Sequence, residues 1–153
     1  MTKLIFQREE WSYIRHIIMP MWERHYQEIT KDKDRVPLDP NWPQYDAMDA
    51  SGALHILTAR FSGGKLAGYV FSLIGPHLHY RSTKCAFFDL YWLDHEARKG
   101  WNGVKLFVEA EKHLKGIGVQ KIYGQTKVWQ DVSPIFQRLG WVESERAFTK
   151  WIS

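Results

Sequence analysis

The chain has 153 residues, of which 44% are hydrophobic and 15% aromatic, including 8 tryptophans. This apolar content excludes a disordered chain, and the length predicts a single domain over residues 1–153 with a sizeable core. The formal net charge is +4. Such a mild excess fits a phosphorylated ligand, a nucleic acid or an ordinary protein surface, and does not choose among them. The single cysteine, Cys85, excludes an intramolecular disulfide and zinc-finger spacing.

The chain shows no targeting or membrane-spanning pattern. Its first apolar run, at residues 4–6, is far too short for a secretory signal. No stretch approaches the roughly 18 consecutive apolar residues that a membrane span needs. We therefore expect a cytoplasmic protein.

The N-terminal part predicts one short strand and a broken amphipathic helix. Residues 4–6 form the expected strand. From residue 8, apolar side chains recur at three- and four-residue steps, the spacing of one helix face: Trp11, Ile14, Ile18 and Met21. Pro20 should interrupt or kink this helix because proline lacks an amide hydrogen and clashes with the preceding turn. A second helical piece is expected over 21–29.

Residues 31–50 are the least regular part of the chain. A charged run at 31–35 is followed by Pro37, Pro40 and Pro43, which predicts a long loop, and long loops in compact domains often serve a function. Trp42 either lines a ligand pocket or holds this loop to the domain. A short helical turn is expected over 45–50.

The remaining chain predicts strands that alternate with two helices. Residues 54–61 and 66–74 form a hairpin around a Gly-Gly turn, which Gly75-Pro76 should end. A third strand over 85–93 leads through a polar loop into a helix, whose apolar face should be Phe107, Ala110, Leu114 and Ile117 and whose end should be marked by Gly116 and Gly118.

A strand over 119–126 follows. A short helix then starts with Ser133 as its N-cap and Pro134 in its first turn, and ends at Gly140. One or two strands are expected over 141–152. The fold class is therefore α/β (α+β), with a central mixed sheet flanked by helices and a parallel strand–helix–strand unit at 85–126.

The loop before the 104–117 helix is the clearest chemical signal. Arg98, Lys99, Gly100 and Gly103 place positive charge and glycines at a helix N-terminus, where unpaired amide hydrogens and the helix dipole attract phosphate. This arrangement predicts a pyrophosphate site. A purely structural role for these glycines remains an alternative, because a tight turn between a strand and a helix also needs glycine. The loop matches neither a P-loop nor a dinucleotide-binding fingerprint.

The same loop resembles a known motif. Arg98-Lys99-Gly100-Trp101-Asn102-Gly103 is similar to the coenzyme A-binding pattern Gln/Arg-x-x-Gly-x-Gly/Ala of the GCN5-related N-acetyltransferase (GNAT) family, with Trp101 where the family has its middle glycine. Four other segments are similar to that family in its order: 64–70, 89–94, 118–122 and 135–141. The resemblance covers residues 54–142. The variant Arg-Lys-Gly-Trp-x-Gly also resembles acetyltransferase-like proteins of tailed bacteriophages, for which the compartment would be the host cytoplasm.

The resemblance implies a GNAT-like fold and an acetyl-CoA-dependent N-acetyltransferase. Residues 54–142 would bind acetyl-CoA or CoA, and residues 8–50 would select an amine acceptor, a small molecule or a protein. The pyrophosphate would lie on the backbone of 99–104 and the pantetheine arm beside 90–93. The implied cofactor-binding residues are Leu90, Trp92, Leu93, Arg98, Lys99, Gly100, Trp101, Asn102, Gly103 and Val104.

The catalytic residues are less clear from the resemblance. Asp89 is the candidate base, with a solvent-facing or turn-capping carboxylate as the alternative. Phe136 stands at the position where the family has a tyrosine that acts as the general acid, and a phenylalanine has no proton to donate. Tyr123 and Tyr91 are the candidate replacements, against simple packing of their rings. A second hypothesis follows from Phe136: a weak or inactive relative that binds CoA or a macromolecular partner as a regulator or inhibitor.

Two further patterns predict no function. His77 and His79 share one strand face, but two histidines do not make a metal site. Phe87, Phe88, Tyr91 and Trp92 have the ring content for stacking on nucleic-acid bases, yet their alternation on an apolar strand favours core packing. We expect neither a metal nor a nucleic acid, and the sequence does not predict the oligomeric state.

Overall fold

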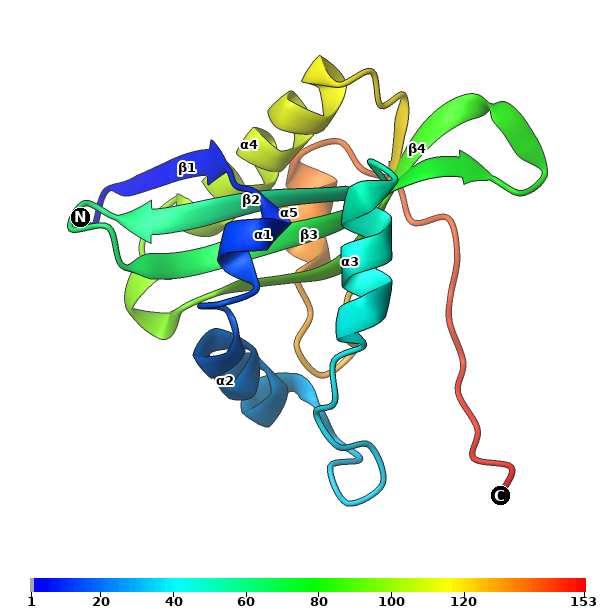
Figure 1. Cartoon of the computed structure of the whole chain (residues 1–153), viewed down its shortest axis with the longest axis horizontal. Coiled ribbons are helices and arrows are strands. Elements are labelled where there is room, and N and C mark those ends of the chain that lie inside the picture. The colour runs from blue at the N-terminus through cyan, green and yellow to red at the C-terminus, as the bar shows by residue number, and fades with distance from the viewer. Residues whose placement is uncertain (1) are drawn as a thin grey trace.

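The computed structural model describes residues 2–153 and contains a five-stranded sheet in the order β1-β2-β3-β4-β5 (Figure 1). The strands are β1 (Leu4–Arg8), β2 (Leu54–Phe61), β3 (Leu66–His77), β4 (Tyr80–Leu93) and β5 (Lys121–Tyr123). The first four pair antiparallel with their neighbours, and β4 pairs parallel with β5. The mixed sheet and its parallel unit confirm the predicted fold class.

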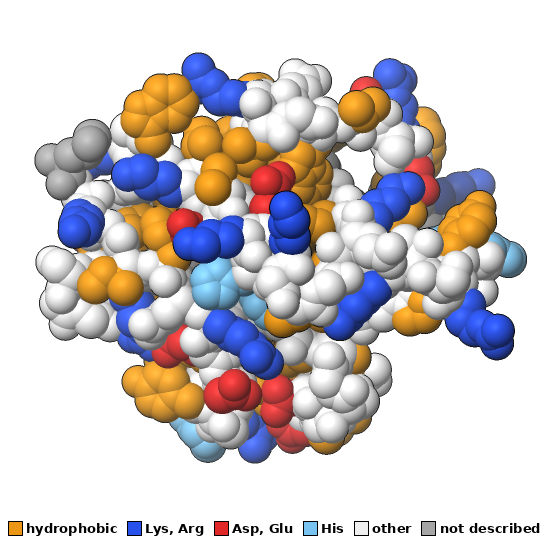
Figure 2. All heavy atoms as spheres, turned by 90° about the horizontal axis from the view of Figure 1, so that it is seen from above, with side chains coloured by type: hydrophobic (Ala, Val, Ile, Leu, Met, Phe, Trp, Pro, Cys, Tyr) orange, Lys and Arg blue, Asp and Glu red, His pale blue; other side chains and the backbone are white. Residues whose placement is uncertain are grey.

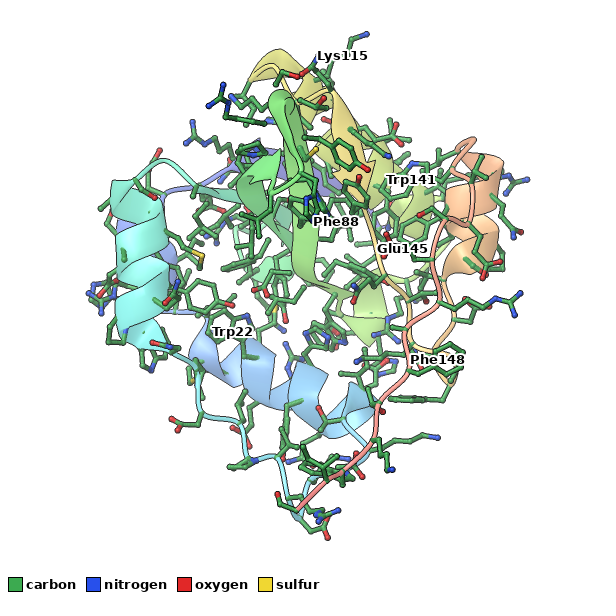
Figure 3. The ribbon with its side chains drawn as sticks, turned by 90° about the vertical axis from the view of Figure 1, so that its right-hand side faces the viewer. Trp22, Phe88, Lys115, Trp141, Glu145 and Phe148 are labelled. Atoms are coloured by element: carbon green, nitrogen blue, oxygen red, sulfur yellow. The ribbon has the colours of Figure 1, made fainter. Side chains whose placement is uncertain are left out.

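Helices cover both faces of this sheet, and each face has its own core. On one face lie α1 (Trp11–Ile14), α2 (Met19–Ile29) and α3 (Trp42–Ala50), and on the other α4 (Asn102–Gly116) and α5 (Ser133–Arg138). A short 3-10 turn, η1 (His95–Ala97), connects β4 to α4. Figure 3 shows Trp22 and Trp141 on opposite sides of the molecule, with Phe88 of the sheet between them.

The N-terminal helix is broken near the predicted point. Trp11, Ile14, Ile18 and Met21 are all buried, which confirms their common apolar face. Pro20 does not kink one continuous helix; it lies in the first turn of α2. A proline costs little there because the amide hydrogen it lacks would have no partner within the helix.

α3 begins earlier than predicted, at Trp42 instead of residue 45. The Asn41 side chain accepts a hydrogen bond from the Gln44 amide at 3.1 Å, and Pro43 occupies the first turn. The Trp42 ring stacks on Trp11 and on Trp22, each at 5.7 Å between ring centroids. Trp42 therefore holds this part of the chain to the domain.

The expected break at Gly75-Pro76 is wrong. β3 continues to His77, and its hairpin with β4 extends beyond the other strands (Figure 1). Pairing with β2 ends at Leu73, so the last residues of β3 form an edge, where proline interrupts no ladder on its free side.

The strands expected over 141–152 are absent. Residues 141–153 form no regular element and run past α5 (Figure 1). At the end of this tail Arg35 lies over the Trp151 ring at 4.2 Å and donates a hydrogen bond to the Ser153 carbonyl. β5 has only three residues, although the expected strand has eight. The sheet edge beside the tail is therefore too short to pair with a further strand.

Smaller differences concern the ends of the two C-terminal helices. Gly118 has φ +87° just after α4 and Gly140 has φ +83° after α5, as the helix-ending predictions require. Ile117 is exposed, so the buried face of α4 ends at Leu114. Ser133 is the first residue of α5 and not its cap; the Asp131 carboxylate accepts its amide hydrogen at 2.9 Å.

Candidate active site

A β-bulge in β4 marks the centre of the site. Phe71 pairs with Leu90 and the adjacent Ser72 pairs with Phe88, so Asp89 has no partner on β3. Such a bulge re-aims a side chain. The exposed Asp89 carboxylate accepts a hydrogen bond from the Tyr45 hydroxyl of α3 at 2.5 Å. The bulge thus directs an acidic group toward the α3 side of the sheet.

Beside the bulge, β4 has an open edge. Its pairing with β5 ends at Phe87 and Tyr123, although β4 continues to Leu93. The Asp94 amide donates to the Ala67 carbonyl of β3 at 2.7 Å. Because backbone groups of an antiparallel strand alternate in direction, those of Leu93 and Tyr91 face away from β3. This edge can pair with an extended ligand as it would with another strand.

The loop after this edge presents amide hydrogens at the start of α4. Gly100 has φ +60°, a conformation that favours glycine. Within residues 2–153 the amide hydrogens of Gly103 and Val104 have no acceptor, as expected in the first turn of a helix. The buried Asn102 side chain fixes the loop, because its Nδ2 donates to the Thr2 and Ala97 carbonyls at 3.0 and 2.9 Å. Asn102 therefore shapes the loop from within.

Arg98, the first residue of the motif, is turned toward α2. Its guanidinium lies 2.7 Å from the Glu28 carboxylate, and its Nε donates to the Leu93 carbonyl at 2.7 Å. Partial burial opposes ionisation of Glu28, but hydrogen bonds from Arg98 and Trp92 hold its pKa below the usual value. The side chains of Arg98 and Trp92 thus tie the loop and β4 to α2, and the exposed Lys99 is the cation that the loop presents to solvent.

Phe136 is packed in an aromatic cluster on the α4 face. Its ring stacks on Trp141 at 4.5 Å and meets Phe107 at 4.9 Å. The outermost ring carbon, Cζ, lies 3.3 Å from where a Cβ on Gly124 would be. Gly124 directly follows β5, so the tip of Phe136 points to where β4 and β5 separate.

Of the two other tyrosines, only Tyr91 lies in this cluster. Its ring is 6.1 Å from that of Phe136, and its hydroxyl donates to the Gln125 carbonyl at 2.5 Å. Burial raises the pKa of Tyr91 to about 12. Tyr123 instead stacks on Phe87 at 4.9 Å. Tyr91 therefore offers a protonated hydroxyl near the opening between the strands, whereas the Tyr123 ring lies against Phe87.

On the opposite face, Asp89 and Leu90 contribute to a pocket of about 540 Å³. The other walls are α2, the loop over residues 30–41 and α3. His25 lines it from α2, with Nδ1 2.6 Å from the Tyr69 hydroxyl. Burial, aided by Arg98 and Lys127, lowers the pKa of His25 to about 4 despite Glu28 nearby. His25 and Tyr45 carried no signal in the sequence, because nothing local connects α2 and α3 to the bulge.

The comparison with solved structures identifies the fold. The structure aligns along nearly its whole length with known acetyltransferases, with TM-scores near 0.7. The chain has the fold of the GCN5-related N-acetyltransferases. No protein-family model matches the chain, and no curated protein matches its sequence.

Three structures illustrate this N-acetyltransferase fold. An aminoglycoside acetyltransferase from an uncultured soil metagenomic sample has a TM-score of 0.73 at 12% identity, covering 99% of both chains. Glucosamine-6-phosphate N-acetyltransferase from Arabidopsis thaliana has 0.69 at 16% identity, again covering 99% of both. A predicted acetyltransferase from Clostridium acetobutylicum, solved with acetyl-CoA, has 0.68 at 9%, covering 98% of this chain and 97% of the other.

The predicted pair of histidines lies away from this site. The His77 and His79 rings are 5.7 Å apart in the β3–β4 hairpin, and no group of three potential ligands occurs among residues 2–153. No helix in the same range is long and apolar enough to cross a membrane. Figure 2, which looks onto the upper side of Figure 1, shows Lys and Arg side chains spread over that face with acidic ones between them. Phe88 and Trp92 are buried, which confirms core packing for these rings.

Proposed function

We propose that this chain is an acetyl-CoA-dependent N-acetyltransferase that acetylates an amine bound in the pocket beside Asp89. One observation carries the proposal: the Asp89 bulge lies between the open edge of β4 and the pocket. A thioester held along that edge would face an amine held in the pocket. Holding two reactants in this way supplies much of the catalysis of acyl transfer.

The residues present fit acetyl-CoA. The free amide hydrogens of Gly103 and Val104, the turn at Gly100 and the exposed Lys99 suit a pyrophosphate. Arg98 already occupies the Leu93 carbonyl, so the pantetheine arm would pair with the Tyr91 backbone and the Leu93 amide. When bound, acetyl-CoA supplies an activated acetyl group. An amide hydrogen of this edge would stabilise the oxyanion that develops on the carbonyl.

Asp89 is the group that would handle the proton of the incoming amine. Its carboxylate would pair with the ammonium and accept the proton, directly or through water. Burial and the neighbouring Asp89 raise the pKa of Tyr45 above its usual value, so its hydroxyl stays protonated and steadies the carboxylate. His25, with its lowered pKa, is neutral near pH 7 and adds no charge that would repel the ammonium.

Tyr91 is our candidate for the proton donor to the departing thiolate. Its hydroxyl would exchange the Gln125 carbonyl for the sulfur. With a pKa of about 12, it is protonated at neutral pH, whereas a thiol loses its proton near pH 8.5. The donor therefore assists departure of a group that is already a moderately good leaving group.

The alternative is a weak or inactive relative that binds CoA or a macromolecular partner as a regulator or inhibitor. Phe136 favours it, since its buried ring offers no proton. That protein would bind acetyl-CoA or its partner without turnover, and substitution at Asp89 would change neither.

The test is release of free CoA from acetyl-CoA in the presence of a pool of primary amines. Asp89→Asn should lower the rate at least tenfold, since a hydrogen bond to a charged group contributes about 1.5–3 kcal/mol. Asp34→Asn, outside the pocket, is the matched control. Turnover equal in the Asp89→Asn variant and the unmodified protein, or no turnover with any amine, would reject the proposal.

A further inference from the structure

The charges that line the pocket are of one sign. Asp39 and Asp89 contribute carboxylates, and the lining residues, all within the described chain, include no Lys or Arg. His25 is the remaining titratable base in the wall. A cationic ligand would be stabilised in this pocket, and a phosphate or carboxylate would be repelled.

Most of the wall is apolar. Ile29, Val36, Leu38, Met48, Leu73 and Leu90 supply aliphatic side chains, and the ring of Trp22 adds an aromatic surface. This composition is typical of pockets that enclose a small ligand, and the volume of about 540 Å³ lies in the range of such sites.

The two tyrosine hydroxyls of the wall are already engaged within the protein. The Tyr26 hydroxyl donates to the Val36 carbonyl at 2.6 Å, and that of Tyr45 donates to Asp89. The other uncharged polar side chains of the wall, Thr30, Asn41 and Gln44, all lie on its 30–44 side. A polyhydroxylated ligand would leave those of its hydroxyls that lie against the apolar walls without partners, which costs about 1–3 kcal/mol for each unsatisfied group.

We infer that the acceptor is a small primary amine with an apolar body, its ammonium at Asp89 and its aliphatic or aromatic part against the α2 and α3 walls. The reaction of this amine rests on the proposed function, but its binding does not. The inference separates this chain from enzymes of the same fold that act on glucosamine-6-phosphate, whose phosphate would meet Asp39 and Asp89 with no cation to balance it.

The test measures binding first, by calorimetry without acetyl-CoA. The probe is 2-phenylethylamine, and the comparisons are 2-phenylethanol, which lacks the charge, and glucosamine-6-phosphate, which adds hydroxyls and phosphate. We expect the amine to bind at least tenfold more tightly than either. Equal or tighter binding of glucosamine-6-phosphate, or no binding of 2-phenylethylamine, would overturn the inference.

Variants assign the binding to this pocket. Asp89→Asn should weaken 2-phenylethylamine at least tenfold and leave 2-phenylethanol unchanged, whereas Asp34→Asn should change neither. Leu38→Asn should weaken both probes, because it makes the apolar wall polar. Unchanged affinities in both pocket variants would place the amine elsewhere and reject the inference.

A transfer assay then separates the two claims. Binding of 2-phenylethylamine without acetylation would leave this inference standing and count against the proposed function. Acetylation of glucosamine-6-phosphate in preference to 2-phenylethylamine would support the proposed function and reject this inference.

Discussion

The hydroxyl of Tyr45 donates a hydrogen bond to the carboxylate of Asp89 at 2.5 Å, across 44 residues of chain. Tyr45 belongs to α3, which covers the same sheet face as α1 and α2, and Asp89 is the bulge residue of β4. The contact therefore connects the part of the chain that would choose the acceptor to the strand that would hold the thioester.

Tyr45→Phe should lower kcat/KM for acetyl transfer by about tenfold, because the Asp89 carboxylate loses a charge-assisted hydrogen bond. The fold should persist, since the ring still stacks on Trp11 at 4.9 Å. Tyr13→Phe, at an exposed site outside the pocket, is the control. A rate equal to that of the unmodified protein would show that Tyr45 does not support Asp89.

Phe136→Tyr should raise kcat several-fold. The added hydroxyl would project from a ring tip aimed at Gly124, where β4 and β5 separate and the sulfur would lie. Release of free CoA measures the rate. Phe148→Tyr, on the exposed tail labelled in Figure 3, is the control. An unchanged rate with normal acetyl-CoA binding would favour the regulatory alternative.

Tyr91→Phe should lower kcat at least tenfold and leave the affinity for acetyl-CoA nearly unchanged, because the backbone edge remains while the proton donor is lost. The double variant Tyr91→Phe/Phe136→Tyr should recover part of the rate. A loss of acetyl-CoA affinity equal to the loss of rate would indicate that Tyr91 acts by packing.

Stability should fall as the pH is lowered from 6.5 toward 4. Burial lowers the pKa values of His25 and His55 to about 4, whereas histidine in an unfolded chain titrates near 6.5. In this window the unfolded state binds protons that the folded state does not. The stabilisation is complete above pH 6.5 and is lost by at most about 1.4 kcal/mol per pH unit for each histidine.

Urea unfolding at pH 7.5 and pH 5 measures this loss. His25→Asn should flatten the dependence of the unfolding free energy on pH, and His16→Asn, at a site where no such burial occurs, should not. An equal drop in all three proteins would assign the pH dependence to other groups.

The sequence predicted most of the sheet and the turn into α4 because their signals are local. Apolar periodicity located α2 and α4, and the glycines at 100 and 103 marked the turn into α4. The extension of β3 past Pro76 was missed because proline's cost depends on whether a neighbouring strand is present. The strands expected over 141–152 do not form because pairing also requires a sheet edge long enough to receive them, and β5 pairs over only three residues.

The pocket beside Asp89 could not be predicted from the sequence, for a related reason. The bulge at Asp89 follows from the register between β3 and β4, and register is a long-range property. Tyr45 and His25 reach the pocket only because stacked Trp11, Trp22 and Trp42 hold α1–α3 on the sheet. Other points remain predictions: the single-domain organisation, the cytoplasmic location, the phage-like resemblance and the individual site residues.

Calorimetric titration with acetyl-CoA tests the central claim most directly. The unmodified protein should bind in the micromolar range. Gly100→Val should abolish binding, because φ +60° is strained for valine and the turn that presents the amides would be lost. Gly118→Val carries the same kind of strain at the other end of α4, with φ +87°, and should bind normally. No binding by the unmodified protein, or equal binding by both variants, would contradict a cofactor site at the start of α4.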